Sequence, residues 1–150
     1  MSEDQEPSFL EEQRSGKTIL VIEDDQDISE LIRLALAEEN SYHILLVPDP
    51  SQALQVAKSR KVNLLIIDYY LATTNGIAFY DTLHAIPELQ QVPAIILSAS
   101  IEKLTKKLEE RNLVGVAKPF ELDELLEIIA KLVNEPASSV SGEKTAPKIS

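Results

Sequence analysis

The chain has no cysteine among its 150 residues. This absence excludes disulfide bridges, thiolate zinc sites and cysteine nucleophiles together. Glycine is scarce as well, with four residues, and none of them follows the first strand that we predict. Nucleotide-binding folds of the Rossmann and P-loop classes need a glycine-rich phosphate loop at that point, so we exclude both classes.

Positive charge and long apolar runs are also in short supply. Lys and Arg number 14 against 25 Asp and Glu, which gives a net charge of −11. A surface that binds nucleic acid would need clustered Lys and Arg, so we expect no nucleic-acid partner. No apolar run approaches the roughly 20 residues that cross a bilayer, and the N-terminus lacks the order of a signal peptide. We therefore expect a cytoplasmic protein with no membrane partner.

The apolar content of 44% is enough for one domain with a substantial core. We place this domain at 16–134, after a flexible acidic arm at 1–15. The segment 135–150 is rich in Pro, Ser, Ala and Lys, a composition typical of a disordered tail. The tail is too short and polar for a DNA-binding module, so we expect a stand-alone domain.

Five short apolar stretches, rich in β-branched residues, alternate with segments of helical periodicity. Runs of this kind are typical of strands buried on both faces of a parallel sheet. The predicted strands are 18–22, 43–47, 62–67, 94–97 and 114–117. The predicted helices are 28–36, 51–58, 77–86, 101–108 and 122–133. The alternation predicts an α/β fold, a doubly wound (βα)5 domain with a five-stranded parallel sheet.

Ionisable or hydroxyl side chains come directly after four of the five predicted strands. They are Glu23 and Asp24, then Asp68, Ser98 and Lys118. Right-handed crossovers bring all these strand ends to one edge of the sheet. Carboxylates that converge there repel one another, so we expect a cation among them. Oxygen ligands without histidine or cysteine select a hard ion such as Mg²⁺.

A phosphoryl group fits beside such an ion. Asp68 can act as a carboxylate nucleophile on phosphorus. Ser98 can donate a hydrogen bond to a phosphoryl oxygen, while Lys118 and the metal offset the charge of the transition state. We interpret Asp25 and Ser100 differently, because each precedes a predicted helix and is expected to cap it.

These residues lie in four motifs: ILVIEDDQDI, LLIIDYYLATTNG, PAIILSAS and VAKPF. With these motifs in order and in register, the chain resembles the receiver domain of bacterial two-component response regulators over about 18–133. The resemblance implies a flavodoxin-like fold with strand order 2-1-3-4-5. It also implies that the Lys118–Pro119 peptide bond is cis.

The resemblance further implies a role for each matching residue. Asp68 would accept a phosphoryl group from a sensor histidine kinase or phosphotransfer protein, with Ser98 and Lys118 contacting that group. The implied Mg²⁺ ligands are Glu23, Asp24, Asp68 and the backbone carbonyl of Tyr70. A phosphohydrolase with an aspartate nucleophile would usually need a second acidic residue at position 70. The tyrosine there favours a phosphate carrier that loses its phosphoryl group slowly, not an enzyme.

Three departures from the family pattern concern the output of the signal. Ala72 replaces a common proline, Gly115 replaces a common aromatic residue, and the segment 98–118 is shorter than usual. Output would pass to a downstream protein through the face of the fourth helix, fifth strand and fifth helix. We expect its exposed edge near Leu104, Val116 and Ile128. The alternative is a receiver-like interaction module that works independently of phosphorylation.

Overall fold

The computed structural model describes residues 16–37 and 42–134, so the predicted arm and tail lie outside the described residues. Its five strands form one parallel sheet in the order β2-β1-β3-β4-β5, which confirms the predicted fold class and strand order. The strands are β1 (Lys17–Ile22), β2 (Tyr42–Val47), β3 (Leu64–Asp68), β4 (Ala94–Ser98) and β5 (Val114–Ala117).

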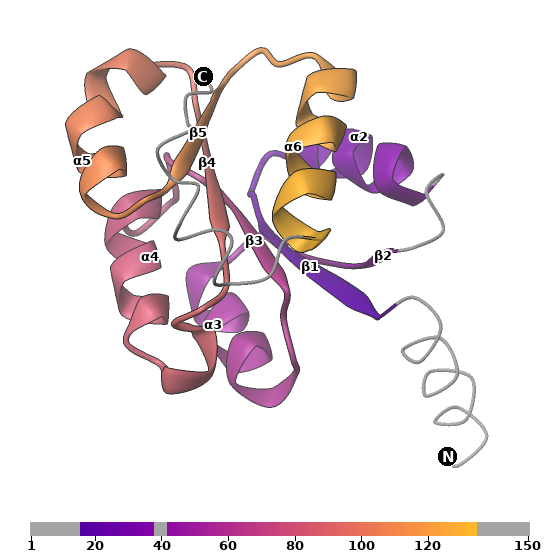
Figure 1. Cartoon of the computed structure of the whole chain (residues 1–150), viewed down its shortest axis with the longest axis vertical. Coiled ribbons are helices and arrows are strands. Elements are labelled where there is room, and N and C mark those ends of the chain that lie inside the picture. Colours follow the sequence, from indigo (N-terminus) through magenta and orange to yellow (C-terminus); the bar gives the residue numbers. More distant parts are fainter. Residues whose placement is uncertain (1–15, 38–41, 135–150) are drawn as a thin grey trace.

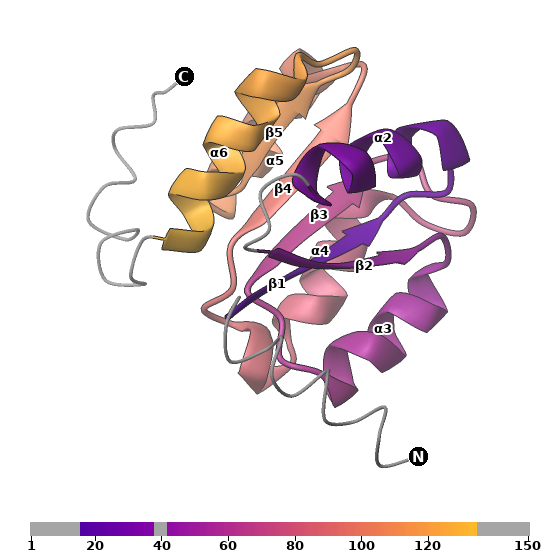
Figure 2. The same ribbon diagram turned by 90° about the vertical axis from the view of Figure 1, so that its right-hand side faces the viewer.

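Helices cover both faces of this sheet (Figures 1 and 2). One face carries α2 (Gln26–Ala37) and α6 (Leu122–Asn134). The other carries α3 (Pro50–Ser59), α4 (Gly76–His84) and α5 (Thr105–Glu110), with the 3-10 helices η1 (Pro87–Leu89) and η2 (Ile101–Leu104). Within the described ranges, no helix is long and apolar enough to span a membrane.

The central strand β3 starts and ends later than predicted. Asn63, placed in the strand by its apolar neighbours, instead pairs with the start of β1. Its side chain accepts the amide of Thr18 at 2.8 Å and its own amide donates to the Thr18 carbonyl at 2.8 Å. At the other end Asp68 is itself the last strand residue, and all five residues of β3 are buried. The carboxylate is therefore held by the sheet and not by a loop.

Two helix predictions need correction. The predicted helix 101–108 is divided into η2 and α5, because the spacing of its apolar residues suits a 3-10 turn as well as an α-helix. Ser100 makes no side-chain cap hydrogen bond to η2 within the described chain, so its predicted capping role is wrong. The cap of α4 is Asn75, whose side chain accepts the Ala78 amide at 2.8 Å.

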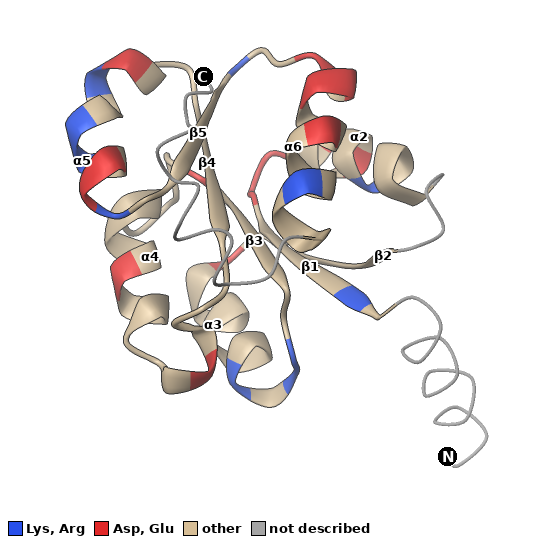
Figure 3. Ribbon diagram, viewed as in Figure 1, with Lys and Arg blue, Asp and Glu red and all other residues tan. Residues whose placement is uncertain are grey.

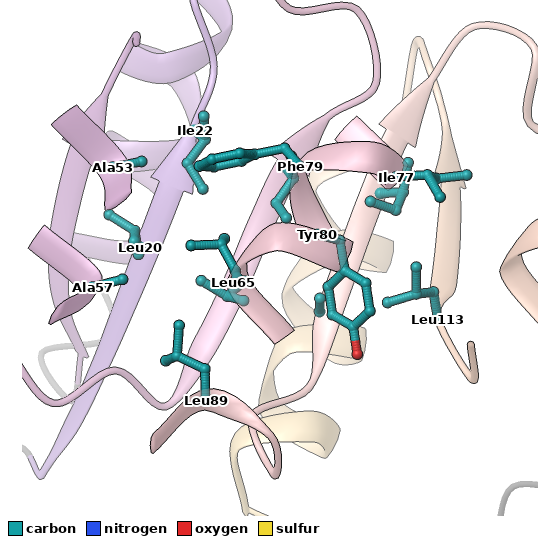
Figure 4. Packing of buried hydrophobic residues seen from close by; sticks show 14 of the residues in the cluster. Leu20, Ile22, Ala53, Ala57, Leu65, Ile77, Phe79, Tyr80, Leu89 and Leu113 are labelled. Atoms are coloured by element: carbon teal, nitrogen blue, oxygen red, sulfur yellow. The ribbon is translucent and has the colours of Figure 1, made fainter. Parts of the chain in front are cut away.

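Alternate side chains of each central strand pack into two cores, one on each side of the sheet. Leu20, Leu65 and Ile96 face α3, α4 and α5, whereas Ile19 and Ile66 face α2 and α6. This alternation follows from the two-residue period of a strand. Figure 4 shows the first of these cores, where Phe79 of α4 extends toward Ile22 of the sheet and Tyr80 lies beside Leu113. The sheet that carries the strand ends is thus packed against helices on both faces.

Of the three residues near the predicted docking edge, two are buried and the third is half-buried. Leu104 and Val116 each expose 7% of their surface and pack into the two cores. The expectation that they form an exposed edge is therefore wrong, since η2 folds Leu104 against the sheet and α6 covers Val116. Ile128 is half-buried against the second core.

An ion pair joins α4 to the end of α5. Arg111 donates from Nε to Asp81 Oδ1 at 2.8 Å and from Nη2 to Asp81 Oδ2 at 2.9 Å. The same guanidinium donates from Nη1 to the carbonyl of Lys107 at 2.9 Å, which closes the last turn of α5. A bidentate contact of this kind fixes the orientation of the guanidinium and the carboxylate as well as their distance. The C-terminal end of α5 is therefore tied to α4.

Asp81→Asn removes the charge of this pair at almost constant size. We expect the free energy of unfolding at neutral pH to fall by about 0.5 kcal/mol, since the pair is partly exposed. The hydrogen bond from Arg111 holds the pKa of Asp81 below its ordinary value. The contribution is therefore complete above that ordinary value and is lost as the pH falls through the lowered pKa. Urea unfolding should show wild type and variant differing at neutral pH and converging in acid. A difference that persists in acid would contradict the electrostatic origin.

Candidate functional site

The site lies at the carboxyl edge of the sheet, around the end of β3. Strands β1 and β4 flank β3, the strand that ends at Asp68. Glu23 directly follows β1, and Ser98 is the last residue of β4. Lys118 follows the edge strand β5, and its amide donates to the Ser98 carbonyl at 2.9 Å. The parallel order thus brings the strand-end residues to one edge, as the sequence predicts.

Three carboxylates form the acidic part of the site. One oxygen each from Glu23, Asp24 and Asp68 can be chosen so that all three lie within 4.8 Å of one another. Glu23 and Asp68 expose only 2% and 4% of their surface, whereas Asp24 is exposed. Two of the negative charges are therefore removed from water, and the third borders the solvent.

Lys118 is the cation that meets these carboxylates. Its Nζ donates to Asp68 Oδ1 at 2.6 Å and lies 3.3 Å from Glu23 Oε1. The Lys118–Pro119 peptide bond is cis, as the family resemblance implies. One ammonium thus stands against three carboxylates.

The pKa values of the site reflect this imbalance. Burial raises the pKa of Glu23, and the nearby charge of Asp68 raises it further. Burial also raises the pKa of Asp68, against the opposing effect of Lys118. Burial by itself would lower the pKa of Lys118, but its bond to Asp68 and the charge of Glu23 outweigh burial and raise it. Both buried carboxylates are therefore destabilised as anions, even with the lysine in place.

Glu23 carries the feature that best fits an additional cation. Its Oε2 accepts the backbone amide of Asp25 at 3.1 Å. Among the described residues, its Oε1 is the buried side-chain oxygen that lacks a hydrogen-bond donor, since the 3.3 Å approach of Lys118 is a charge contact without hydrogen-bond geometry. An orphaned buried oxygen beside two other carboxylates suits a hard divalent ion, which binds oxygen ligands. The residues present therefore fit Mg²⁺.

Ser98 and Tyr70 are the two remaining residues predicted for the site. Ser98 is buried, and its Oγ accepts the amide of Ser100 at 3.0 Å. The Tyr70 side chain is 62% exposed and packs edge-on against Tyr69, with ring centroids 4.9 Å apart. The predicted metal contact of the Tyr70 carbonyl stays a prediction.

Two groups that shape the site were not identified from the sequence. The Asp25 amide holds Glu23, while the Asp25 side chain caps α2 as predicted by accepting the amides of Asp27 and Ile28. Gly76 closes the loop after Asp68, and a β-carbon there would lie 2.5 Å from the Asp68 carbonyl oxygen. The Asn-Gly pair signals a turn in the sequence, but this close approach appears only in three dimensions.

Lys118→Met removes the ammonium at similar side-chain length. We expect the affinity for Mg²⁺ to rise about tenfold (~1.4 kcal/mol), because the lysine charge competes with a metal for the same carboxylates. Titration calorimetry with magnesium chloride measures this, and Lys131→Met, on an exposed position of α6, should bind Mg²⁺ as wild type does. Unchanged or weaker binding by the Lys118 variant would show that the lysine does not compete for the metal position.

Comparison with known proteins identifies the family. The model of the response regulator receiver domain matches residues 19–130. The phosphate regulon transcriptional regulatory protein PhoB of Pseudomonas aeruginosa is 33% identical over 134 residues, covering 88% of this chain and 57% of PhoB. The signal transduction histidine-protein kinase BarA of Escherichia coli is 26% identical over 141 residues, covering 93% of this chain and 15% of BarA. The chain thus spans about half of PhoB and a small part of BarA.

The fold agrees with this assignment. The crystal structure of the receiver domain of the sensor histidine kinase PA1611 from Pseudomonas aeruginosa superimposes with a TM-score of 0.71 at 24% identity, covering 79% of this chain and 98% of that domain. The strand order, the acidic residues at the strand ends and the span matched by the family model all agree with a receiver domain. The chain belongs to the response regulator receiver domain family of two-component signalling.

Proposed function

We propose that Asp68 accepts a phosphoryl group from a phosphohistidine. In this transfer a carboxylate oxygen of Asp68 forms a bond to phosphorus, the phosphorus–nitrogen bond breaks, and the imidazole nitrogen keeps the electron pair. The observation that carries the proposal is the placement of Asp68, buried at the end of the central strand among two further carboxylates and bonded to Lys118. Burial that raises the pKa of Asp68 also makes its carboxylate less solvated and more nucleophilic.

Glu23, Asp24, Asp68 and the Tyr70 carbonyl are the proposed Mg²⁺ ligands. The orphaned Oε1 of Glu23 supports this set, and the PA1611 receiver holds a magnesium ion in its active-site cleft. A magnesium ion there would neutralise charge on the carboxylates and on the incoming phosphoryl oxygens.

Lys118 and Ser98 would bind the phosphoryl group itself. Lys118 already contacts the carboxylate that becomes phosphorylated, so a small movement of its flexible side chain brings Nζ to a phosphoryl oxygen. Ser98 offers a hydroxyl on the neighbouring strand. Together they would stabilise charge that develops on the phosphoryl oxygens.

The proposed donor is a sensor histidine kinase or a phosphotransfer protein, and the proposed output is binding to a downstream protein. The likeness to BarA, a histidine-protein kinase, supports a role beside phosphohistidine chemistry. A second candidate function is binding that does not depend on phosphorylation. Gly115 favours it, because this position has no side chain that could change orientation after phosphorylation.

Asp68→Asn tests the phosphoacceptor directly. After incubation with Mg²⁺ and acetyl phosphate, intact-mass spectrometry of the wild type should show the gain of one phosphoryl group, and the variant should show none. The gain should also vanish when EDTA removes the metal. Asp25→Asn is the matched control, because asparagine caps helices as well as aspartate does and residue 25 lies outside the carboxylate group.

The control variant should be phosphorylated like the wild type. Phosphorylation of the Asp68 variant would place the acceptor elsewhere. A wild type that gains no phosphoryl group, either from acetyl phosphate or from a phosphorylated histidine kinase, would favour the second candidate function.

A further inference from the structure

Gly115 leaves a notch in β5 that two aliphatic side chains fill. A β-carbon on Gly115 would lie 2.7 Å from Leu108 Cδ1 and 2.9 Å from Ile101 Cδ1. Both distances are well inside van der Waals contact, so no side chain fits at this position while Ile101 and Leu108 keep theirs. Ile101 belongs to η2 and Leu108 to α5, and both pack in the same core. The notch is thus where these two elements lock onto the sheet.

The same isoleucine is connected to Ser98 by a short hydrogen-bonded turn. Ser98 Oγ accepts the Ser100 amide at 3.0 Å, and the Ser100 carbonyl accepts the Lys103 amide at 3.0 Å. Ile101 directly follows Ser100, the residue that makes both bonds, and is the first residue of η2. The hydroxyl of Ser98 and the start of η2 at Ile101 are therefore connected through the hydrogen bonds of Ser100.

The far end of α5 is held independently. The Asp81–Arg111 ion pair fixes it to α4, and the Leu113 amide donates to the Leu108 carbonyl at 2.9 Å. These contacts hold the far end of α5 without involving Ser98.

We propose that Ile101 and Leu108, seated in the Gly115 notch, form the switch that couples Ser98 to α5. The proposal rests on the phosphoryl chemistry proposed for Asp68. Turning the Ser98 hydroxyl toward a phosphoryl group on Asp68 carries Oγ away from the Ser100 amide. The turn then loses its bond, and Ile101 withdraws from the notch. These two side chains, which we call the aliphatic plug, thereby take the role that a rotating side chain on β5 would have.

Coupling of this kind is reciprocal, so displacing the plug must alter Ser98. Gly115→Ala supplies the displacement without any phosphoryl group, since its methyl group claims the space of Ile101 Cδ1. We expect the methyl signals of Ile101 and Leu108 and the amide signal of Ser100 to shift together in NMR spectra. We also expect the rate of phosphorylation by acetyl phosphate to rise about fivefold, the lower end of typical coupling between sites.

A second substitution separates the switch from simple loss of packing. Ile101→Val in the Gly115→Ala background removes one of the two Cδ1 atoms that the new methyl group meets, the one on the residue next to Ser100. It should return the Ser100 amide signal and the phosphorylation rate part of the way toward wild type. Ile86→Val is the matched control, because Ile86 packs against the same core from the residue before η1. It should leave the effects of Gly115→Ala in place.

The outcomes distinguish the switch from the phosphoryl chemistry. A Gly115→Ala protein whose Ile101 and Leu108 signals shift while the Ser100 amide stays at its wild-type position overturns the switch. Equal rescue by Ile86→Val overturns it too. If no variant gains a phosphoryl group, the proposed function fails, but the Ser100 amide in the unphosphorylated proteins still decides the coupling.

Discussion

Three carboxylates and one ammonium share the carboxyl edge of this sheet, and the chemistry of the site depends on how their charges balance. Lys118 meets Asp68 at 2.6 Å and Glu23 only as a charge contact at 3.3 Å, which leaves a buried oxygen of Glu23 without a donor. Paired and hydrogen-bonded charges are tolerated in a protein interior, but an uncompensated charge is costly. The arrangement therefore suits a second cation beside the lysine.

The sheet provides the rigidity that this balance requires. Asp68 ends a strand that lies between β1 and β4, whose ends also carry site residues, and β3 is buried along its whole length. The segments that carry Ser98 and Lys118 also connect the site to η2 and β5. Ser98 leads into η2 within three residues, and Lys118 directly follows the strand that contains the Gly115 notch. The acidic edge and the packing of α5 are thus connected through short segments of the chain.

Much of this structure follows from local patterns in the sequence. Asp68 stands out because a buried apolar run stops there, and Lys118 because it follows the last short strand; the resemblance to receiver domains then supplied strand order. The division of the helix at 101–108 was not predictable, because spacings of three and four residues suit both helix types. Nor was the burial of Leu104, since the sequence does not tell which face of that segment meets the sheet. Gly115 was recognisable as a missing aromatic, but only the packing shows which side chains replace it.

The most direct test of the central claim is the dependence of the free energy of unfolding on Mg²⁺ concentration. If the carboxylates form a cation site, the folded chain alone binds the ion, and stability rises by about 1.4 kcal/mol for each tenfold increase above the dissociation constant. The Asp25→Asn protein should show the same rise, because that residue caps α2. A free energy of unfolding that stays constant as Mg²⁺ is added, at fixed ionic strength, would contradict the account.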